Sequence, residues 1–257
     1  MEFGLCAPLE DAGLVRDLGF SYIEVNAAQI GQMSGEAFAA ALARSKALGF
    51  PVKRANCLFP GELRLCGPDM RPDAVAAWLR KVMPRLAALG VEKAVFGSGG
   101  ARKRPEGLPY PAAFRDLVRV CRMIGGAAEA SGLTVVIEPL NIRETDMINS
   151  LAEGAALMAA ADHPCVGLLA DAYHLAMEGE HPSEIARVGG VGHVHVALKE
   201  GRRWPVAEDA ALREFFLGLR AAGYDGCVSV EGNSGDRAAD APAALAALRR
   251  LEGAGIA

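Results

Sequence analysis

Acidic and imidazole residues stand at the carboxyl ends of four successive apolar segments in the second half of the chain. The segment VVIEPLNIRETD (135–146) is apolar up to Glu138 and polar beyond it. The next three apolar segments end with Asp171, His195 and Glu231. Carboxylate oxygens and one imidazole suit a divalent ion such as Mn²⁺, Mg²⁺, Co²⁺ or Zn²⁺, and they leave positions open for a bidentate substrate. We therefore predict that these four residues bind one divalent metal ion.

Each of these residues also has an ordinary structural explanation. A single carboxylate at a strand end is most often a helix N-cap or a solvated loop residue. Three carboxylates in one low-dielectric pocket, however, would repel each other strongly unless a cation lay between them. The occurrence of four such residues on four successive segments therefore favours the metal site.

Two histidines compete for the role of metal ligand in the segment 191–197. His193 and His195 are two residues apart, so on a strand their side chains share a face and lie about 7 Å apart along it. Only the residue nearer the carboxyl end should reach the mouth of the site. We assign His195 to the metal and expect His193 to lie deeper, in the core or behind the ligands.

Alternating strand and helix patterns run through the whole chain and would position these residues. Eight short β-rich segments are evident: 2–6, 22–26, 52–59, 93–98, 134–140, 166–171, 191–197 and 227–232. Between them lie segments of helical period such as 36–49, 71–90, 114–132, 212–223 and 241–253. Eight repeats without a linker predict an α/β fold, a single (β/α)8 TIM barrel over residues 1–257. A doubly wound open sheet fits less well, because the first turn, CAPLED, lacks a GxGxxG motif.

The composition limits the classes of partner. The chain has 257 residues, a net charge of −4 and 51% hydrophobic residues, which is typical of a globular protein and gives no basic footprint for nucleic acid or for an anionic membrane. Six cysteines without a CxxC motif predict free thiols, and the absence of a signal or membrane segment predicts a cytoplasmic protein. We expect a small-molecule partner, and a homo-oligomer is possible.

The motifs EPLNIRET, DAYH, GHVHVA and SVEG together resemble the xylose isomerase-like TIM barrels, a superfamily of sugar phosphate isomerases and epimerases. Its members include ketose 3-epimerases, hydroxypyruvate isomerases, inosose-processing enzymes and repair enzymes of the endonuclease IV type. The resemblance implies the same four metal ligands. It also implies that substrate is contacted by His174, by Glu144 and by an arginine near position 201, where Gly201 stands and Arg202 and Arg203 follow.

The nucleic-acid branch of this superfamily does not match. Enzymes resembling endonuclease IV use a three-metal cluster that needs histidines in the N-terminal half and a DxH element after the seventh strand. All five histidines lie after residue 160, and the chain has no DxH element in that position. We therefore expect no nucleic-acid substrate.

These observations predict a divalent-metal-dependent sugar or sugar phosphate isomerase or epimerase. The expected chemistry is proton transfer through a metal-bound enediolate, with Glu138 and Glu231 as base and acid. An inosose-type dehydratase or lyase on the same metal site and a non-catalytic sugar-binding barrel are the alternatives. The loop FGSGGARKRPEG (96–107) contains Arg102, Lys103 and Arg104 and is either an anion-binding loop or a solvated lid.

Overall fold

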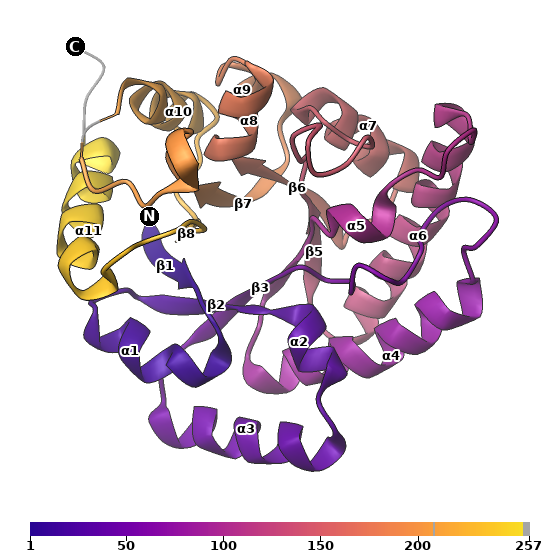
Figure 1. Cartoon of the computed structure of the whole chain (residues 1–257), viewed down its shortest axis with the longest axis horizontal. Coiled ribbons are helices and arrows are strands. Elements are labelled where there is room, and N and C mark those ends of the chain that lie inside the picture. Colours follow the sequence, from indigo (N-terminus) through magenta and orange to yellow (C-terminus); the bar gives the residue numbers. More distant parts are fainter. Residues whose placement is uncertain (208, 254–257) are drawn as a thin grey trace.

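Eight parallel strands close into a barrel in the computed structural model, which describes residues 1–207 and 209–253 (Figure 1). Each strand pairs with its neighbours in sequence, and β1 also pairs with β8 to complete the ring. The strands are β1 Glu2–Cys6, β2 Tyr22–Asn26, β3 Val52–Asn56, β4 Lys93–Phe96, β5 Thr134–Ile137, β6 Val166–Asp171, β7 Val191–Val196 and β8 Cys227–Val230. This confirms the predicted (β/α)8 barrel; residues 208 and 254–257 of the predicted domain lie outside the described residues.

Several strands end earlier than their sequence patterns predict. β5 and β8 stop one residue before Glu138 and Glu231, so these carboxylates begin the βα loops instead of ending the strands. Their backbones are still fixed, because the N–H of Glu138 donates to the carbonyl of Phe96 (3.2 Å) and that of Glu231 donates to the carbonyl of Val196 (3.1 Å). The side chains therefore start from a rigid position at the barrel rim.

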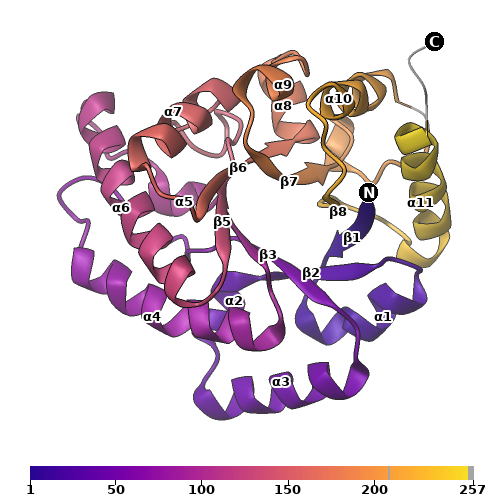
Figure 2. The ribbon, with the colours of Figure 1, turned by 180° about the vertical axis from the view of Figure 1, so that it is seen from behind.

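The helices form a ring outside the strands (Figures 1 and 2). The long helical patterns correspond to α3 Gly35–Leu48, α4 Pro72–Leu89, α6 Tyr110–Ala130, α10 Ala210–Ala221 and α11 Arg237–Gly253. The shorter helices are η1 Leu9–Asp11, α1 Ala12–Asp17, α2 Ala27–Gln32, α5 Gly99–Arg102, α7 Leu151–Ala161, α8 Ala172–Glu178, α9 Glu184–Val188 and η2 Glu200–Arg202. Among the described residues, no helix has the length and apolar character needed to cross a bilayer.

Aromatic and charged side chains close the N-terminal end of the barrel. Tyr22 is fully buried, and a Cβ at Gly4 would lie 2.2 Å from its ring, so glycine is required on the neighbouring strand. Arg54 is 4% exposed and donates to the Glu92 carboxylate (2.6 Å) and to the carbonyl of Lys53 (2.8 Å). The open end of the barrel is therefore the C-terminal one, where the site residues lie.

Candidate metal centre

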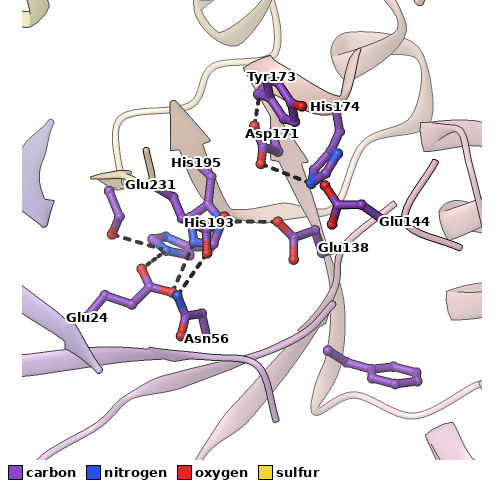
Figure 3. A network of polar contacts seen from close by, with 12 residues as sticks. Glu24, Asn56, Glu138, Glu144, Asp171, Tyr173, His174, His193, His195 and Glu231 are labelled. Atoms are coloured by element: carbon purple, nitrogen blue, oxygen red, sulfur yellow. Dashed lines mark hydrogen bonds and ion pairs between the residues drawn. The ribbon is translucent and has the colours of Figure 1, made fainter. Parts of the chain in front are cut away.

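Four side chains, each at or directly after the end of one of four successive strands, converge at the C-terminal mouth of the barrel (Figure 3). Glu138, Asp171, His195 and Glu231 each offer one ligand atom, and these atoms all lie within 4.8 Å of one another. The Nδ1 atom of His195 is 3.1 Å from Oε1 of Glu138 and 3.3 Å from Oε2 of Glu231. The barrel thus brings together all four residues that the sequence singled out as metal ligands.

Asp171 provides a test of whether this cluster fits a cation. Its Oδ1 accepts from the backbone N–H of Tyr173 (2.7 Å) and caps helix α8, which is the ordinary role of a strand-end Asp. Its Oδ2 is buried and has no hydrogen-bond partner; Nε2 of His174 is 3.5 Å away and the Arg202 guanidinium is 3.6 Å away. An unsatisfied buried carboxylate oxygen is costly. A divalent ion would satisfy it, so the residues present fit a metal.

Gly97, directly after β4, makes room for Glu138. A Cβ at position 97 would lie 2.1 Å from Oε2 of Glu138, so any other residue would displace the carboxylate. The fully buried guanidinium of Arg102 donates to the carbonyls of Glu138 (2.7 Å) and Phe96 (3.1 Å). The fourth strand therefore contributes space and backbone support to the site.

The two glutamates of the cluster differ in their electrostatics. Burial raises the pKa of Glu138, and the neighbouring charge of Glu231 raises it further. Burial acts in the same direction on Glu231, but the charges of His195 and Arg202 outweigh it and lower the pKa of Glu231 to about 2. Burial lowers the pKa of His195, whereas the carboxylates of Glu24 and Glu231 raise it, with a net shift well above the usual value. Glu138 thus holds a proton more readily than Glu231.

Arg202 and Asn56 fix the position of Glu231. Nη2 of Arg202 donates to Oε2 of Glu231 (2.5 Å), and Nδ2 of Asn56 donates to Oε1 (2.8 Å). The Arg202 guanidinium also lies 3.4 Å from Glu144 and 4.7 Å from the centre of the Tyr173 ring. Arg203, in contrast, is exposed and donates to the carbonyl of Glu200 (3.3 Å), so only the first of the two arginines lies at the site.

Asn141 connects His174 and Glu144, the two other residues implied by the family resemblance. The backbone N–H of Asn141 donates to Nδ1 of His174 (3.0 Å), and its side-chain amide lies 2.8 Å from the same atom and 3.0 Å from Oε1 of Glu144. Because Nδ1 accepts, a neutral His174 carries its proton on Nε2, which is buried and has no hydrogen-bond partner. His174 is therefore oriented as a donor beside Asp171.

Sequence reasoning assigned no role to several residues that support the site. Asn56 stands at the end of an apolar strand and Glu24 within another one, but nothing in the sequence shows what they contact. Asn141 belongs to the EPLN motif, yet its contacts with two site residues depend on the loop conformation. The role of Gly97 had one signal in the sequence: the segment FGSGG (96–100) follows an apolar segment but contains no acidic or imidazole residue.

The two arginines of the 96–107 loop contact the protein itself. Arg102 is buried against the backbone, and Arg104 pairs with Asp146 (3.0 Å) and donates to the carbonyl of Leu108 (2.6 Å). Lys103 is exposed. Of the two interpretations of this loop, the structure therefore gives no support to an arginine-based anion site.

A parallel barrel with a carboxylate and imidazole cluster at its C-terminal mouth defines a TIM barrel with a candidate metal site. Residues 12–251 match the xylose isomerase-like TIM barrel family, to which this chain therefore belongs.

Proteins similar to this chain include sugar epimerases and isomerases. The 3-dehydro-D-guloside 4-epimerase of Escherichia coli K12 is 26% identical over 235 residues, which cover 87% of this chain and 86% of that protein. The D-psicose 3-epimerase of Agrobacterium fabrum is 30% identical over 121 residues, which cover 45% of this chain and only 42% of that relative. A crystal structure of a D-psicose 3-epimerase in the presence of D-fructose superposes with a TM-score of 0.86 and 22% identity, covering 99% of this chain and all of that one. At 22% sequence identity, the match to this crystal structure shows that the two proteins share a fold.

Proposed function

We propose that this protein is a divalent-metal-dependent isomerase or epimerase that moves a proton at a carbon next to the carbonyl of a small keto sugar. The observation that carries the proposal is the cluster of Glu138, Asp171, His195 and Glu231, with one Asp171 oxygen buried and unsatisfied. The names of the similar epimerases support the reaction class.

The four clustered residues would hold the metal. A divalent ion bound there acts as a Lewis acid and stabilises negative charge that develops on substrate oxygens by several kcal/mol. The same ion would remove the repulsion among the three carboxylates.

The two glutamates are suited to complementary proton transfers. Asn56 and Arg202 hold the Glu231 carboxylate from one side. The Glu138 carboxylate lies across the cluster, on the other side of His195 Nδ1. One carboxylate would take a proton from carbon and the other would return one. In the reverse direction the two residues exchange roles. Return of the proton to the opposite face of the same carbon gives epimerisation, and its return to the adjacent carbon gives isomerisation.

The side chains around the ligand cluster favour a neutral polyol over a sugar phosphate. The N–H on Nε2 of His174 is buried and has no hydrogen-bond partner, and the exposed Glu144 carries a carboxylate, so a bound substrate hydroxyl would find both a donor and an acceptor. The arginines of the 96–107 loop are bound to protein groups, and Arg202 is shared among carboxylates. We therefore assign an unphosphorylated keto sugar as substrate.

The test combines metal analysis with hydrogen exchange. Purified protein is analysed for bound metal, loaded with Mn²⁺ and incubated in D₂O with a panel of free keto sugars and their phosphates. Deuterium should enter a carbon next to the carbonyl of a free sugar without loss of water. Glu138→Gln and Glu231→Gln should each abolish this exchange, while Glu106→Gln, an exposed acid on the same face of the barrel, should leave it unchanged.

Two outcomes would contradict the proposal. An unsaturated or deoxy product would identify a dehydratase. A metal-loaded protein that exchanges no deuterium with any sugar of the panel would argue for a binding barrel.

A further inference from the structure

Glu24 lies inside the barrel, directly behind the metal-ligand cluster (Figure 3). It is in the middle of β2 and is fully buried. Each of its carboxylate oxygens faces a different histidine: Oε1 lies 3.0 Å from Nε2 of His195, and Oε2 lies 2.8 Å from Nε2 of His193. A buried carboxylate is tolerated only when such partners satisfy it.

The surrounding contacts hold this arrangement in place. Nδ1 of His193 lies 3.1 Å from the carbonyl oxygen of Cys227, and its Nε2 lies 3.5 Å from the hydroxyl of Ser229. Ser229 in turn is 2.8 Å from the hydroxyl of Tyr22, which closes the barrel below. Glu24 therefore has little freedom to turn away from His195.

The geometry determines which nitrogen of His195 can bind a metal. Glu24 accepts a hydrogen bond, so Nε2 of His195 carries a proton. The other nitrogen, Nδ1, faces Glu138 and Glu231. A carboxylate that accepts from the distal N–H of a metal-ligating imidazole orients the ring and increases its basicity.

We propose that Glu24 is a positioning residue for the metal centre: it holds the His195 ring so that Nδ1 is directed at the metal. This inference rests on the metal site of the proposed function. It adds a residue from the first half of the chain to a site whose ligands all come from the second half.

Glu24 would have a different role if it bound the metal directly together with Cys6. The Cys6 thiol lies with Glu24 and His195 in a group whose candidate ligand atoms are within 4.8 Å of one another, so Glu24 could in principle be a ligand itself. Both Glu24 oxygens, however, already face imidazole nitrogens. If Cys6 and Glu24 bound the ion directly, Cys6→Ser would weaken binding, whereas a positioning role predicts no effect.

The experiment titrates metal-stripped full-length protein with Co²⁺ and follows its visible absorption. Glu24→Met removes both acceptors with little change in volume and should weaken Co²⁺ binding about 100-fold, at the upper end of the usual effect of such supporting residues. Glu24→Gln keeps one oxygen for His195, but a neutral amide is a weaker acceptor, so we expect a loss of about tenfold. Both variants should also shift the Co²⁺ absorption bands, which a general loss of stability would not do.

Cys6→Ser and Glu92→Gln are the controls. Glu92 pairs with Arg54 at the N-terminal end of the barrel, away from the ligand cluster, so its variant should bind Co²⁺ within twofold of the wild type. The inference is overturned if Glu24→Gln binds Co²⁺ within twofold of the wild type with unchanged bands, or if Cys6→Ser weakens binding as much as Glu24→Gln. Should Glu24→Met fail to fold, Glu24→Gln alone decides. If the wild-type protein binds no Co²⁺, both the proposed metal site and this inference fail. If the wild type binds Co²⁺ and Glu24→Gln binds it equally well, only this inference fails.

Discussion

Asn141 shows how a residue without acid or base chemistry can prepare two others for substrate. Its backbone N–H sets the tautomer of His174, and its side-chain amide contacts both His174 and Glu144. Its Oδ1 accepts from the backbone N–H of Arg143 (3.1 Å), which fixes the amide. The donor and the acceptor proposed for substrate hydroxyls therefore depend on one side chain.

Replacing Asn141 by Ala should reduce kcat/KM about tenfold, because the loss of about 1 to 1.5 kcal/mol per hydrogen bond is concentrated on substrate contacts. Metal affinity should not change, since Asn141 contacts none of the four proposed ligands in the described structure. Steady-state kinetics on the sugar found in the exchange screen, together with a Co²⁺ titration, measure both quantities. Asn141→Asp should be at least as harmful because it places a second carboxylate beside Glu144. An unchanged kcat/KM in both variants would contradict this role.

At the scale of elements, backbone strain is concentrated in the loops at the C-terminal mouth. Five described residues other than glycine have positive φ, and four of them follow strands: Cys57 (50°), Ser98 (43°), Ile148 (61°) and Arg202 (50°). The fifth, Asp162, is the C-cap of α7 at the other end of the barrel. Such conformations cost about 1 to 3 kcal/mol each and persist where surrounding contacts impose them. At Arg202 this backbone conformation accompanies a side chain that donates to the Glu231 carboxylate.

Gly97 and Gly100 lie in the same βα segment and give a matched pair of substitutions. Gly97→Ala should displace the Glu138 carboxylate and weaken Co²⁺ binding at least tenfold, because the new Cβ would lie 2.1 Å from Oε2. Gly100→Ala should bind Co²⁺ as the wild type does, because its Cβ would meet the Cα of Gly61 at an ordinary 3.4 Å. Thermal unfolding of both variants shows whether the fold is retained. Equal affinities for the two variants would mean that Glu138 is not positioned as the structure indicates.

At the scale of the whole molecule, charged side chains are arranged differently at the two ends of the barrel. The C-terminal mouth gathers three carboxylates around His195. The N-terminal end pairs its charges, as with Arg54 and Glu92. Metal binding should therefore affect stability through the C-terminal end, and ionisation of the pair between Arg54 and Glu92 through the N-terminal end.

Metal binding should raise the melting temperature. A ligand that binds only the folded state at 100 times its Kd adds about 2.7 kcal/mol, which for a domain of this size corresponds to roughly 5–10 °C. Differential scanning calorimetry with Mn²⁺ and with EDTA measures the shift. Glu138→Gln should strongly reduce the increase in melting temperature that Mn²⁺ causes. A shift of equal size in that variant would place the ion elsewhere.

Acid should remove the contribution that the ion pair between Arg54 and Glu92 makes to the free energy of unfolding. Burial acts to raise the pKa of Glu92, but the hydrogen bond and charge of Arg54 outweigh it, so the folded-state pKa is lowered. Stabilisation is then present above the unfolded pKa of about 4.3 and is lost as the pH falls through the folded value. Glu92→Gln should lower the free energy of unfolding by less than about 1 kcal/mol at pH 7, since Glu92 is 56% exposed, and the difference should vanish toward pH 2. Urea unfolding at several pH values tests this; a difference that grows in acid would contradict it.

The strand and helix periods and the four strand-end residues could be predicted because they are local features. Eight alternating segments are visible in any window of ten to twenty residues, and the parallel barrel follows from their repetition. The convergence of Glu138, Asp171, His195 and Glu231 then follows from the rule that strand ends share one face of the barrel. The shorter helices were less visible, because a segment such as LAEGAALMAAA (151–161) has no continuous polar face.

The sequence by itself determined the eightfold repeat and the chemical types of the residues at the mouth of the barrel. Only the tertiary structure decided that Arg202 and not Arg203 lies at the site, that Arg102 is a buried support, and that Glu24 lies behind His195. The physical reason is the separation along the chain: Glu24 and His195 are 171 residues apart and meet only because β2 and β7 line the same closed barrel. Periodicity determines which elements form, whereas contacts between side chains of distant elements depend on closure and register.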